Sequence, residues 1–159
     1  DLHYPLRRQR QMCIRDSSRV ARSLTEGLEK MNTGEIILVS PKDYEPDMTL
    51  FKGAKYTDNT ESALRNADVV VTLRVQKERM ENETQFIDLS QYYKDYGLTS
   101  ERLALCKKDA IVMHPGPMNR GVEIENIVAD GPQSVITEQV TNGIATRMAI
   151  LSIIEKSTV

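Results

Sequence analysis

The stretch DVVVTLR, residues 68–74, is rich in β-branched side chains and predicts a strand. TESALRNAD, at 60–68, comes directly before it and predicts a helix with Thr60 as its cap. AIVMH, at 110–114, predicts another strand further along the chain, after two more helical segments. An alternation of strands and helices of this kind favours an open parallel α/β sheet flanked by helices.

The segments on either side continue this alternation. EIILVSP, at 35–41, predicts a strand ended by a proline, and KYT, at 55–57, predicts a shorter extended segment. Apolar residues at helical spacing predict amphipathic helices near 19–31, 83–97 and 137–156. Their apolar faces are, in chain order, Val20, Leu24, Leu28 and Met31; Phe86, Leu89, Tyr93 and Tyr96; and Val140, Ile144, Met148 and Leu151.

The N-terminal part of the chain does not fit this pattern. A sheet of this Rossmann-like type usually begins with a strand, but the first regular element here is a helix that starts near Arg19, so we expect the sheet to lack its first strand. Residues 1–17 contain four arginines, and RRQRQMCIRD at 7–16 resembles a translated sequencing-adapter read-through. We therefore expect 1–17 to be an artefactual or disordered leader and 18–159 to form the domain. A basic arm that binds an acidic partner is the alternative for the leader.

Composition excludes several classes of function. With 159 residues the chain has room for about one domain, and its 40% hydrophobic and 28% charged residues are typical of a soluble globular protein. A net charge of −2, without a basic stripe, argues against nucleic-acid binding, and no apolar run is long enough for a membrane span. The two cysteines show neither a disulfide framework nor a metal-binding spacing, which favours a reducing cytoplasm and no metal. We expect Cys106 to be buried or half-buried.

The first candidate site directly follows the strand at 68–74. Arg74 and Gln76 point to the same side if the chain stays extended, because side chains alternate along a strand. A guanidinium can hold a carboxylate through two parallel hydrogen bonds, and an amide two residues later can add a third. A charged loop in solvent is the alternative interpretation of the same spacing.

The second candidate is the corner HPGPMNRG, residues 114–121, which follows the strand AIVMH. Pro115 and Pro117 remove two backbone donors, so the carbonyl groups there are available to a ligand, and Gly116 allows close approach. Open α/β sheets bind ligands outside the carboxyl ends of their strands, where this corner lies. A rigid turn without a ligand remains the alternative, and His114 can be either a structural or a catalytic histidine.

Arg19 is the third candidate. It stands at the start of the first predicted helix, where its charge adds to the positive end of the helix and favours an anion. Arg22, one turn along the helix, could serve the same end or simply face solvent.

Four motifs together resemble the catalytic chains of aspartate carbamoyltransferases. LRVQKER at 73–79 is similar to the family's aspartate-binding loop, and MHPGPMNRGVEI at 113–124 is similar to its other C-terminal signature. SRVARS at 18–23 resembles the opening of the family's second domain, and EQVTNGIATRMAIL at 138–151 resembles its last helix. The related ornithine enzymes carry a cysteine-containing HCLP at the corner, so Pro115 after His114 favours the aspartate branch.

The resemblance implies a cytoplasmic enzyme of pyrimidine biosynthesis. In this reaction the α-amino group of L-aspartate attacks carbamoyl phosphate, and the products are N-carbamoyl-L-aspartate and phosphate. Arg19, Arg74 and Gln76 would then hold the aspartate carboxylates, and the carbonyls of Pro115, Gly116 and Pro117 would accept hydrogen bonds from both substrates. The resemblance also implies a cis Gly116–Pro117 bond, a homotrimer, and no metal or organic cofactor.

Other family motifs are absent from the printed sequence. The Ser-Thr-Arg-Thr loop and the His-x-x-Gln segment, which hold carbamoyl phosphate in the family, do not occur. We therefore expect the transition-state residues to lie in a missing half, no catalytic residue to lie in this chain, and the chain to be inactive alone. Two alternatives remain open: a non-catalytic binding module for acidic amino acids, and a nucleotide-binding domain, although no G-x-G-x-x-G follows a strand.

Overall fold

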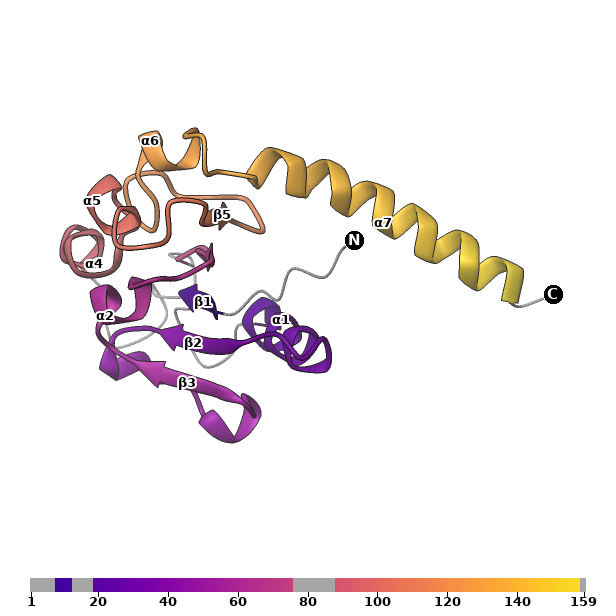
Figure 1. Ribbon diagram of the computed structural model, residues 1–159, viewed down its shortest axis with the longest axis horizontal. Coiled ribbons are helices and arrows are strands. Elements are labelled where there is room, and N and C mark those ends of the chain that lie inside the picture. The colour runs from indigo at the N-terminus through magenta and orange to yellow at the C-terminus, as the bar shows by residue number, and fades with distance from the viewer. Residues whose placement is uncertain (1–7, 13–18, 76–87, 158–159) are drawn as a thin grey trace.

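The computed structural model of this chain describes residues 8–12, 19–75 and 88–157. Its five strands form one parallel sheet in the order β3-β2-β1-β4-β5 (Figure 1). The strands are β1 (Arg8–Met12), β2 (Glu35–Val39), β3 (Ala54–Thr57), β4 (Val69–Val71) and β5 (Ile111–Met113). The predicted open parallel α/β sheet is confirmed, and winding from β1 proceeds to one side through β2 and β3 and to the other side through β4 and β5.

Helices and short 3₁₀ turns connect these strands. The described helices are α1 (Arg19–Lys30), α2 (Thr60–Leu64), α4 (Leu89–Tyr96), α5 (Ser100–Leu103), α6 (Asn126–Ala129) and α7 (Ile136–Ser157). The 3₁₀ turns are η1 (Lys42–Tyr44) and η2 (Met48–Leu50). The first helix and the last helix end within about one residue of their predicted bounds, and the half-buried Cys106 agrees with prediction.

The prediction that the sheet lacks its first strand is wrong. β1 lies in the centre of the sheet and pairs with both β2 and β4, with Gln11 opposite Leu38 on one side and Val71 on the other. The prediction relied on apolar pattern, which this Arg- and Gln-rich segment lacks. The ladder is formed by backbone groups, so a polar segment between two strands can still complete it. The assignment of residues 1–17 to a leader stays a prediction.

β4 is buried on both faces of the sheet. Val70 belongs to one apolar cluster, together with Leu98, Val112 and Ile124 among others, whereas Val69 and Val71 belong to a second cluster. Successive side chains of a strand point to opposite faces, so a run of three valines supplies both clusters. The second cluster also contains, from other elements, Ala21, Leu38, Phe51 and Leu73.

The buried face of α1 agrees only in part with the one predicted, since Leu28 is buried and Leu24 packs against the second cluster, but Val20 and Met31 do not pack there. Ala21, Thr25 and Leu28 are its buried residues, whereas Val20 is 43% exposed and Met31 is 74% exposed. Small side chains at two of the three buried positions let the helix lie close to the strands, which apolar spacing alone does not reveal.

The cap of α2 also differs from the prediction. The side chain of Asn59 accepts a hydrogen bond from the Ser62 backbone N–H, which makes Asn59 the N-cap. Thr60 is buried, and its hydroxyl donates to the carbonyl of Asp95 at 3.0 Å. Thr60 therefore joins α2 to the end of α4.

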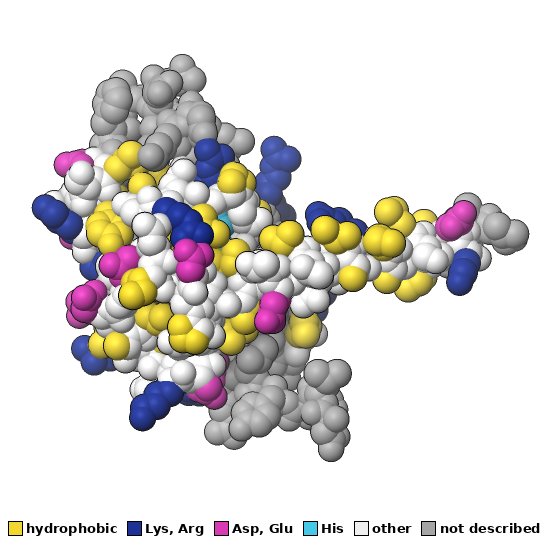
Figure 2. Space-filling view, turned by 90° about the horizontal axis from the view of Figure 1, so that it is seen from above, with side chains coloured by type: hydrophobic (Ala, Val, Ile, Leu, Met, Phe, Trp, Pro, Cys, Tyr) yellow, Lys and Arg dark blue, Asp and Glu magenta, His cyan; other side chains and the backbone are white. Residues whose placement is uncertain are grey.

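α7 extends away from the rest of the molecule (Figure 1). The space-filling view shows yellow apolar side chains along its length (Figure 2). Its large apolar side chains that are at least 50% exposed are Val140, Ile144, Met148, Ile150, Leu151, Ile153 and Ile154. The predicted apolar face of this helix is therefore present but uncovered. Within the described ranges, no helix combines the length and the apolar character needed to cross a membrane.

Candidate functional site

The two candidate segments of the sequence lie side by side at one edge of the sheet. Val71 is in register with Met113, and the Thr72 backbone N–H donates to the Met113 carbonyl at 3.0 Å, so β4 and β5 end together. β4 is also the neighbour of β1, and the sheet reverses its direction of winding between these two strands. Ligands of open α/β sheets bind outside the carboxyl ends of the strands at such a reversal.

The corner after β5 presents its backbone to solvent. Pro115, Gly116 and Pro117 are exposed, and the Gly116–Pro117 bond is cis, as the resemblance implied. Gly116 has a φ of 68°, a left-handed conformation that favours glycine. Among the described residues, no donor is hydrogen-bonded to the carbonyl oxygens of these three residues. They are therefore acceptors that a ligand can reach.

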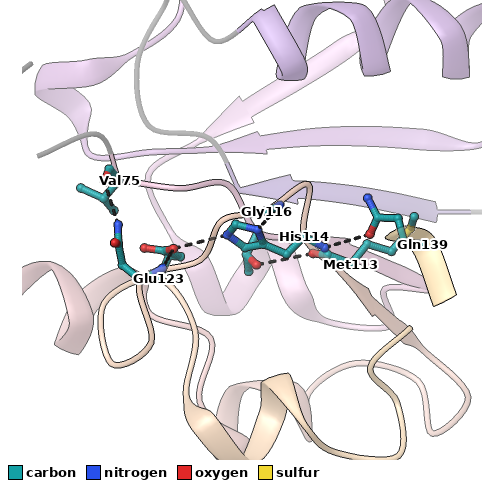
Figure 3. A network of polar contacts seen from close by, with 8 residues as sticks. Val75, Met113, His114, Gly116, Glu123 and Gln139 are labelled. Atoms are coloured by element: carbon teal, nitrogen blue, oxygen red, sulfur yellow. Dashed lines mark hydrogen bonds and ion pairs between the residues drawn. The ribbon is translucent and has the colours of Figure 1, made fainter. Parts of the chain in front are cut away.

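Several protein groups contact His114 and hold it in place (Figure 3). Its side chain is fully buried, with Nε2 3.3 Å from Glu123 Oε1, and Nδ1 accepts a hydrogen bond from the Gly116 N–H at 2.8 Å. The backbone N–H of His114 donates to Gln139 Oε1, in the first turn of α7, at 3.1 Å. These contacts favour the structural interpretation of this histidine.

Glu123 holds two residues of the corner, and one of them, Asn119, contacts the segment after β4. Its Oε1 accepts a hydrogen bond from the Asn119 backbone N–H as well as facing His114. The Asn119 side chain in turn donates to the carbonyl of Val75 at 2.9 Å. Glu123 is only 1% exposed, and its Oε2 has no hydrogen-bond partner within the described part of the chain. The side chain of Asn119 thus joins two segments far apart in sequence, and the buried carboxylate of Glu123 holds the backbone of Asn119.

Arg74 is half-buried between two buried neighbours. Leu73 is 5% exposed and belongs to the second cluster, and Val75 is fully buried against Tyr92 and Val122. This packing fixes the backbone on both sides of Arg74. Gln76, the partner predicted for Arg74, lies outside the described residues.

The packing beneath Val75 differs in part from the predicted face of α4. Tyr92, which was not on that face, is the buried residue, and its ring stacks on Tyr96 with a centroid distance of 5.3 Å. Leu89 and Tyr96 of the predicted face pack against the same cluster, and Phe86 lies outside the described ranges. Burial raises the pKa of Tyr96, with a smaller contribution from the nearby charge of Asp58.

Arg19 is not brought into contact with the other candidates. It is the first residue of α1 and is exposed, and its carbonyl accepts a hydrogen bond from the Ser23 hydroxyl at 2.9 Å. No hydrogen bond or ion pair within the described ranges joins Arg19 to Arg74 or to the corner. α1 follows β1, across residues 13–18, which the structure does not describe.

A second arginine, within the corner itself, is already paired. The Arg120 guanidinium donates to both carboxylate oxygens of Asp130, at 2.6 and 2.8 Å, and so ties the corner to the end of α6. These hydrogen bonds lower the pKa of Asp130 and raise the pKa of Arg120. The Arg120 side chain is therefore part of the contacts that hold the corner in place.

Three residues of the site were missed by sequence reasoning: Asn119, Glu123 and Gln139. Glu123 left a signal, because it stands as a single acid between Val122 and Ile124, both of which are buried. An acidic residue between two apolar residues, directly after the corner, indicates that its side chain makes a buried polar contact. Asn119 and Gln139 left no comparable signal.

The arrangement suits a ligand that carries both an amine and a carboxylate. Exposed carbonyl oxygens accept hydrogen bonds from an amino group, and a guanidinium binds a carboxylate through two hydrogen bonds. Among the described residues, no group of three or more His, Cys, Asp or Glu side chains could hold a metal ion. A small amino acid therefore fits the chemistry of this edge.

Comparison with known proteins supports the same interpretation. The family model described as aspartate/ornithine carbamoyltransferase, Asp/Orn binding domain, matches residues 9–154. The aspartate carbamoyltransferase catalytic subunit of Ruthia magnifica subsp. Calyptogena magnifica is 50% identical over 137 residues, which are 86% of this chain and 42% of that protein.

Two solved structures show the same fold. The anabolic ornithine carbamoyltransferase of Campylobacter jejuni superposes with a TM-score of 0.76 at 20% identity, over 94% of this chain and 52% of that chain. The aspartate transcarbamoylase of Trypanosoma cruzi, in complex with phosphate, has a TM-score of 0.71 at 25% identity, over 92% of this chain and 50% of that chain.

The chain spans about two fifths of the length of the curated relative and about half the length of the two solved chains. The matched range includes the corner, the segment after β4 and almost all of α7. The chain therefore belongs to the aspartate/ornithine carbamoyltransferase family, as a match to its Asp/Orn binding domain.

Proposed function

We propose that this chain is the aspartate-binding part of an aspartate carbamoyltransferase. Such an enzyme transfers the carbamoyl group of carbamoyl phosphate to the α-amino group of L-aspartate in pyrimidine biosynthesis. One observation carries the proposal: the segment with Arg74 and the carbonyl-rich corner at 115–117 are held together at the reversal point of the sheet. The 50% identity to a catalytic subunit of that name supports aspartate over ornithine.

The roles of the residues follow from their chemistry. Arg74 binds one aspartate carboxylate through two hydrogen bonds, and Gln76 and Arg19 complete the carboxylate contacts. The carbonyls of Pro115, Gly116 and Pro117 accept hydrogen bonds from the amino groups of both substrates. A transfer between two substrates gains much of its rate from holding them in a fixed geometry, and this corner supplies that geometry on the aspartate side.

Carbamoyl phosphate requires further groups. The Ser-Thr-Arg-Thr and His-x-x-Gln motifs do not occur in the printed sequence, and the curated relatives are considerably longer than this chain. Stabilisation of the developing charge is usually the largest contribution to such catalysis. We therefore expect the chain alone to bind aspartate without turnover, and we place the complete enzyme in the cytoplasm as a homotrimer without a cofactor.

Titration calorimetry with L-aspartate tests the proposal. The wild-type chain should bind saturably at millimolar concentrations. Arg74→Ala should weaken binding roughly ten- to a hundredfold, because a charged hydrogen-bonded pair is lost. Arg65→Ala, which removes an exposed arginine at the end of α2, should leave binding unchanged. L-Ornithine, which carries an amine in place of the second carboxylate, should not compete.

Three results of these experiments would contradict the expectations. Absence of saturable aspartate binding would reject the proposed function, and equal affinity in Arg74→Ala and Arg65→Ala would reject the assignment of Arg74. Formation of carbamoyl-aspartate by the purified chain would reject the expectation that it is inactive alone.

A further inference from the structure

We propose that His114 and Glu123 form a positioning pair that couples the two segments of the site. The pair fixes the backbone of the corner and, through Asn119, the backbone of Val75 (Figure 3). What the corner binds rests on the proposed function, but the coupling itself follows from contacts within the chain. Both residues are buried, with at most 1% of their surface exposed, so both act through the backbone that they hold.

The hydrogen bonds assign the tautomer of the imidazole. Nδ1 of His114 accepts the Gly116 N–H at 2.8 Å, so this nitrogen carries no hydrogen. The ring hydrogen is then on Nε2, which faces Glu123 Oε1 at 3.3 Å. Nδ1 must accept the hydrogen bond from Gly116, and Nε2 must donate to Glu123. Moving the hydrogen to Nδ1 would set two donors against each other at Gly116.

The network runs without interruption between the two segments. It passes from the Gly116 N–H through the His114 ring to the Glu123 carboxylate, and from there through Asn119 to the Val75 carbonyl. One end is the middle of the exposed corner, and the other end directly follows Arg74. A displacement of the corner is therefore transmitted to the backbone beside Arg74.

The burial of Glu123 points to a specific role. A carboxylate with one oxygen buried and without a hydrogen-bond partner in the described part of the chain costs stability, and an apolar side chain would fill such a place at lower cost. The carboxylate remains useful because one oxygen accepts from both His114 and Asn119. An apolar residue cannot make this junction.

The tautomer can be measured directly. The chain contains two histidines, and only His114 lies within the described residues, so long-range ¹H–¹⁵N correlation spectra are simple to assign. The wild-type chain without ligand should show a single His114 tautomer with its hydrogen on Nε2. A hydrogen on Nδ1, or an equal mixture of tautomers, would overturn the proposal.

Variants of Glu123 separate positioning from general stability. Glu123→Gln keeps an acceptor oxygen and should keep the wild-type tautomer. Glu123→Ala removes the acceptor, so tautomers should mix and the Gly116 amide should exchange at least about tenfold faster, as expected for one lost hydrogen bond. Thr60→Val removes another buried hydrogen bond, to Asp95, and serves as the control that loses stability without changing His114.

Asn119→Ala tests the coupling without disturbing the buried pair. It removes only the side-chain bond to the Val75 carbonyl, so the Val75 carbonyl resonance should shift while the His114 tautomer stays unchanged. An unmoved Val75 resonance, or unchanged Gly116 exchange in Glu123→Ala, would overturn the coupling. These spectra need no aspartate, so a failure of aspartate binding would reject the proposed function and leave this result standing.

Discussion

Two isoleucines differ in burial between α7 and the rest of the described molecule, which is called the body below. Ile124 is fully buried in the cluster with Leu98 and Val112, whereas Ile144 in α7 is 52% exposed. Ile144 belongs to the predicted apolar face of α7, whereas Ile124 lies in the loop after the corner, where no apolar face was predicted. Apolar periodicity therefore predicts that a helix has a face for packing, but it does not show what covers that face.

The strongest test of this comparison is to shorten each of the two isoleucine side chains to alanine. Ile124→Ala should lower the free energy of unfolding by about 2–5 kcal/mol, because it leaves a cavity in a closed cluster. Ile144→Ala should change it by no more than about 0.5 kcal/mol, because the side chain is already half in solvent. Denaturant unfolding followed by circular dichroism measures both. Similar losses in the two variants would show that α7 is covered in solution.

A pair of glycines tests the same comparison through the room around the backbone. A Cβ at Gly131, after α6, would lie 2.6 Å from the Ile127 carbonyl oxygen, whereas a Cβ at Gly143 in α7 would meet only the end of Arg147 at 3.9 Å. Gly131→Ala should therefore destabilise the body by about 1–3 kcal/mol. Gly143→Ala should strengthen the helix by about 0.5–1 kcal/mol.

Thermal unfolding and helix content by circular dichroism measure the two glycine variants. The expected signs are opposite, so each variant serves as the control for the other. A destabilising Gly143→Ala would mean that this face of α7 is closely packed against another surface in solution.

The smallest expected effect concerns charge at the surface of the body. Hydrogen bonds from Arg120 lower the pKa of Asp130 from its ordinary value of 3.8, so the pair stabilises the fold above that pH. Its contribution disappears as the pH falls from 3.8 through the lower folded-state pKa. Both groups are exposed, so only a slight difference in melting temperature is expected between wild type and Arg120→Ala at neutral pH, with none in stronger acid.

An NMR titration of the Asp130 carboxyl measures this pKa directly. In Arg120→Ala it should return toward 3.8, and in Arg147→Ala, which removes an exposed arginine of α7, it should stay lowered. An Asp130 pKa that Arg120→Ala does not move would contradict the assigned cause.

Much of the fold was predictable because apolar pattern and chain order determine it. The three valines of β4 and the alternation around them correctly predicted a parallel α/β sheet. β1 was missed because its pairing uses backbone groups, which leave no pattern in side chains such as Arg and Gln. The buried face of α1 was predicted correctly for Leu24 and Leu28 but not for Ala21 and Thr25, because a close approach to the sheet selects small residues.

The candidate site was predictable only where its chemistry lies in the backbone. Two prolines around Gly116 predicted an exposed corner of carbonyl groups, and the structure has such a corner beside the segment with Arg74. The contacts that hold it there, through Glu123 and Asn119, depend on the folding of a loop that has no periodic pattern. Arg19, Arg74, Gln76 and the carbonyls of residues 115–117 all stay predictions as ligands of the substrates.

The projecting helix gives the molecule a hydrodynamic signature. α7 has 22 residues and is therefore about 33 Å long. A compact chain of 159 residues has a radius of gyration of about 15 Å, so a helix of this length outside the body must enlarge that value and slow rotational diffusion. X-ray scattering would register α7 as a tail in the pair-distance distribution. A second protein surface packed along α7 would remove that tail even though the mass of the particle increased.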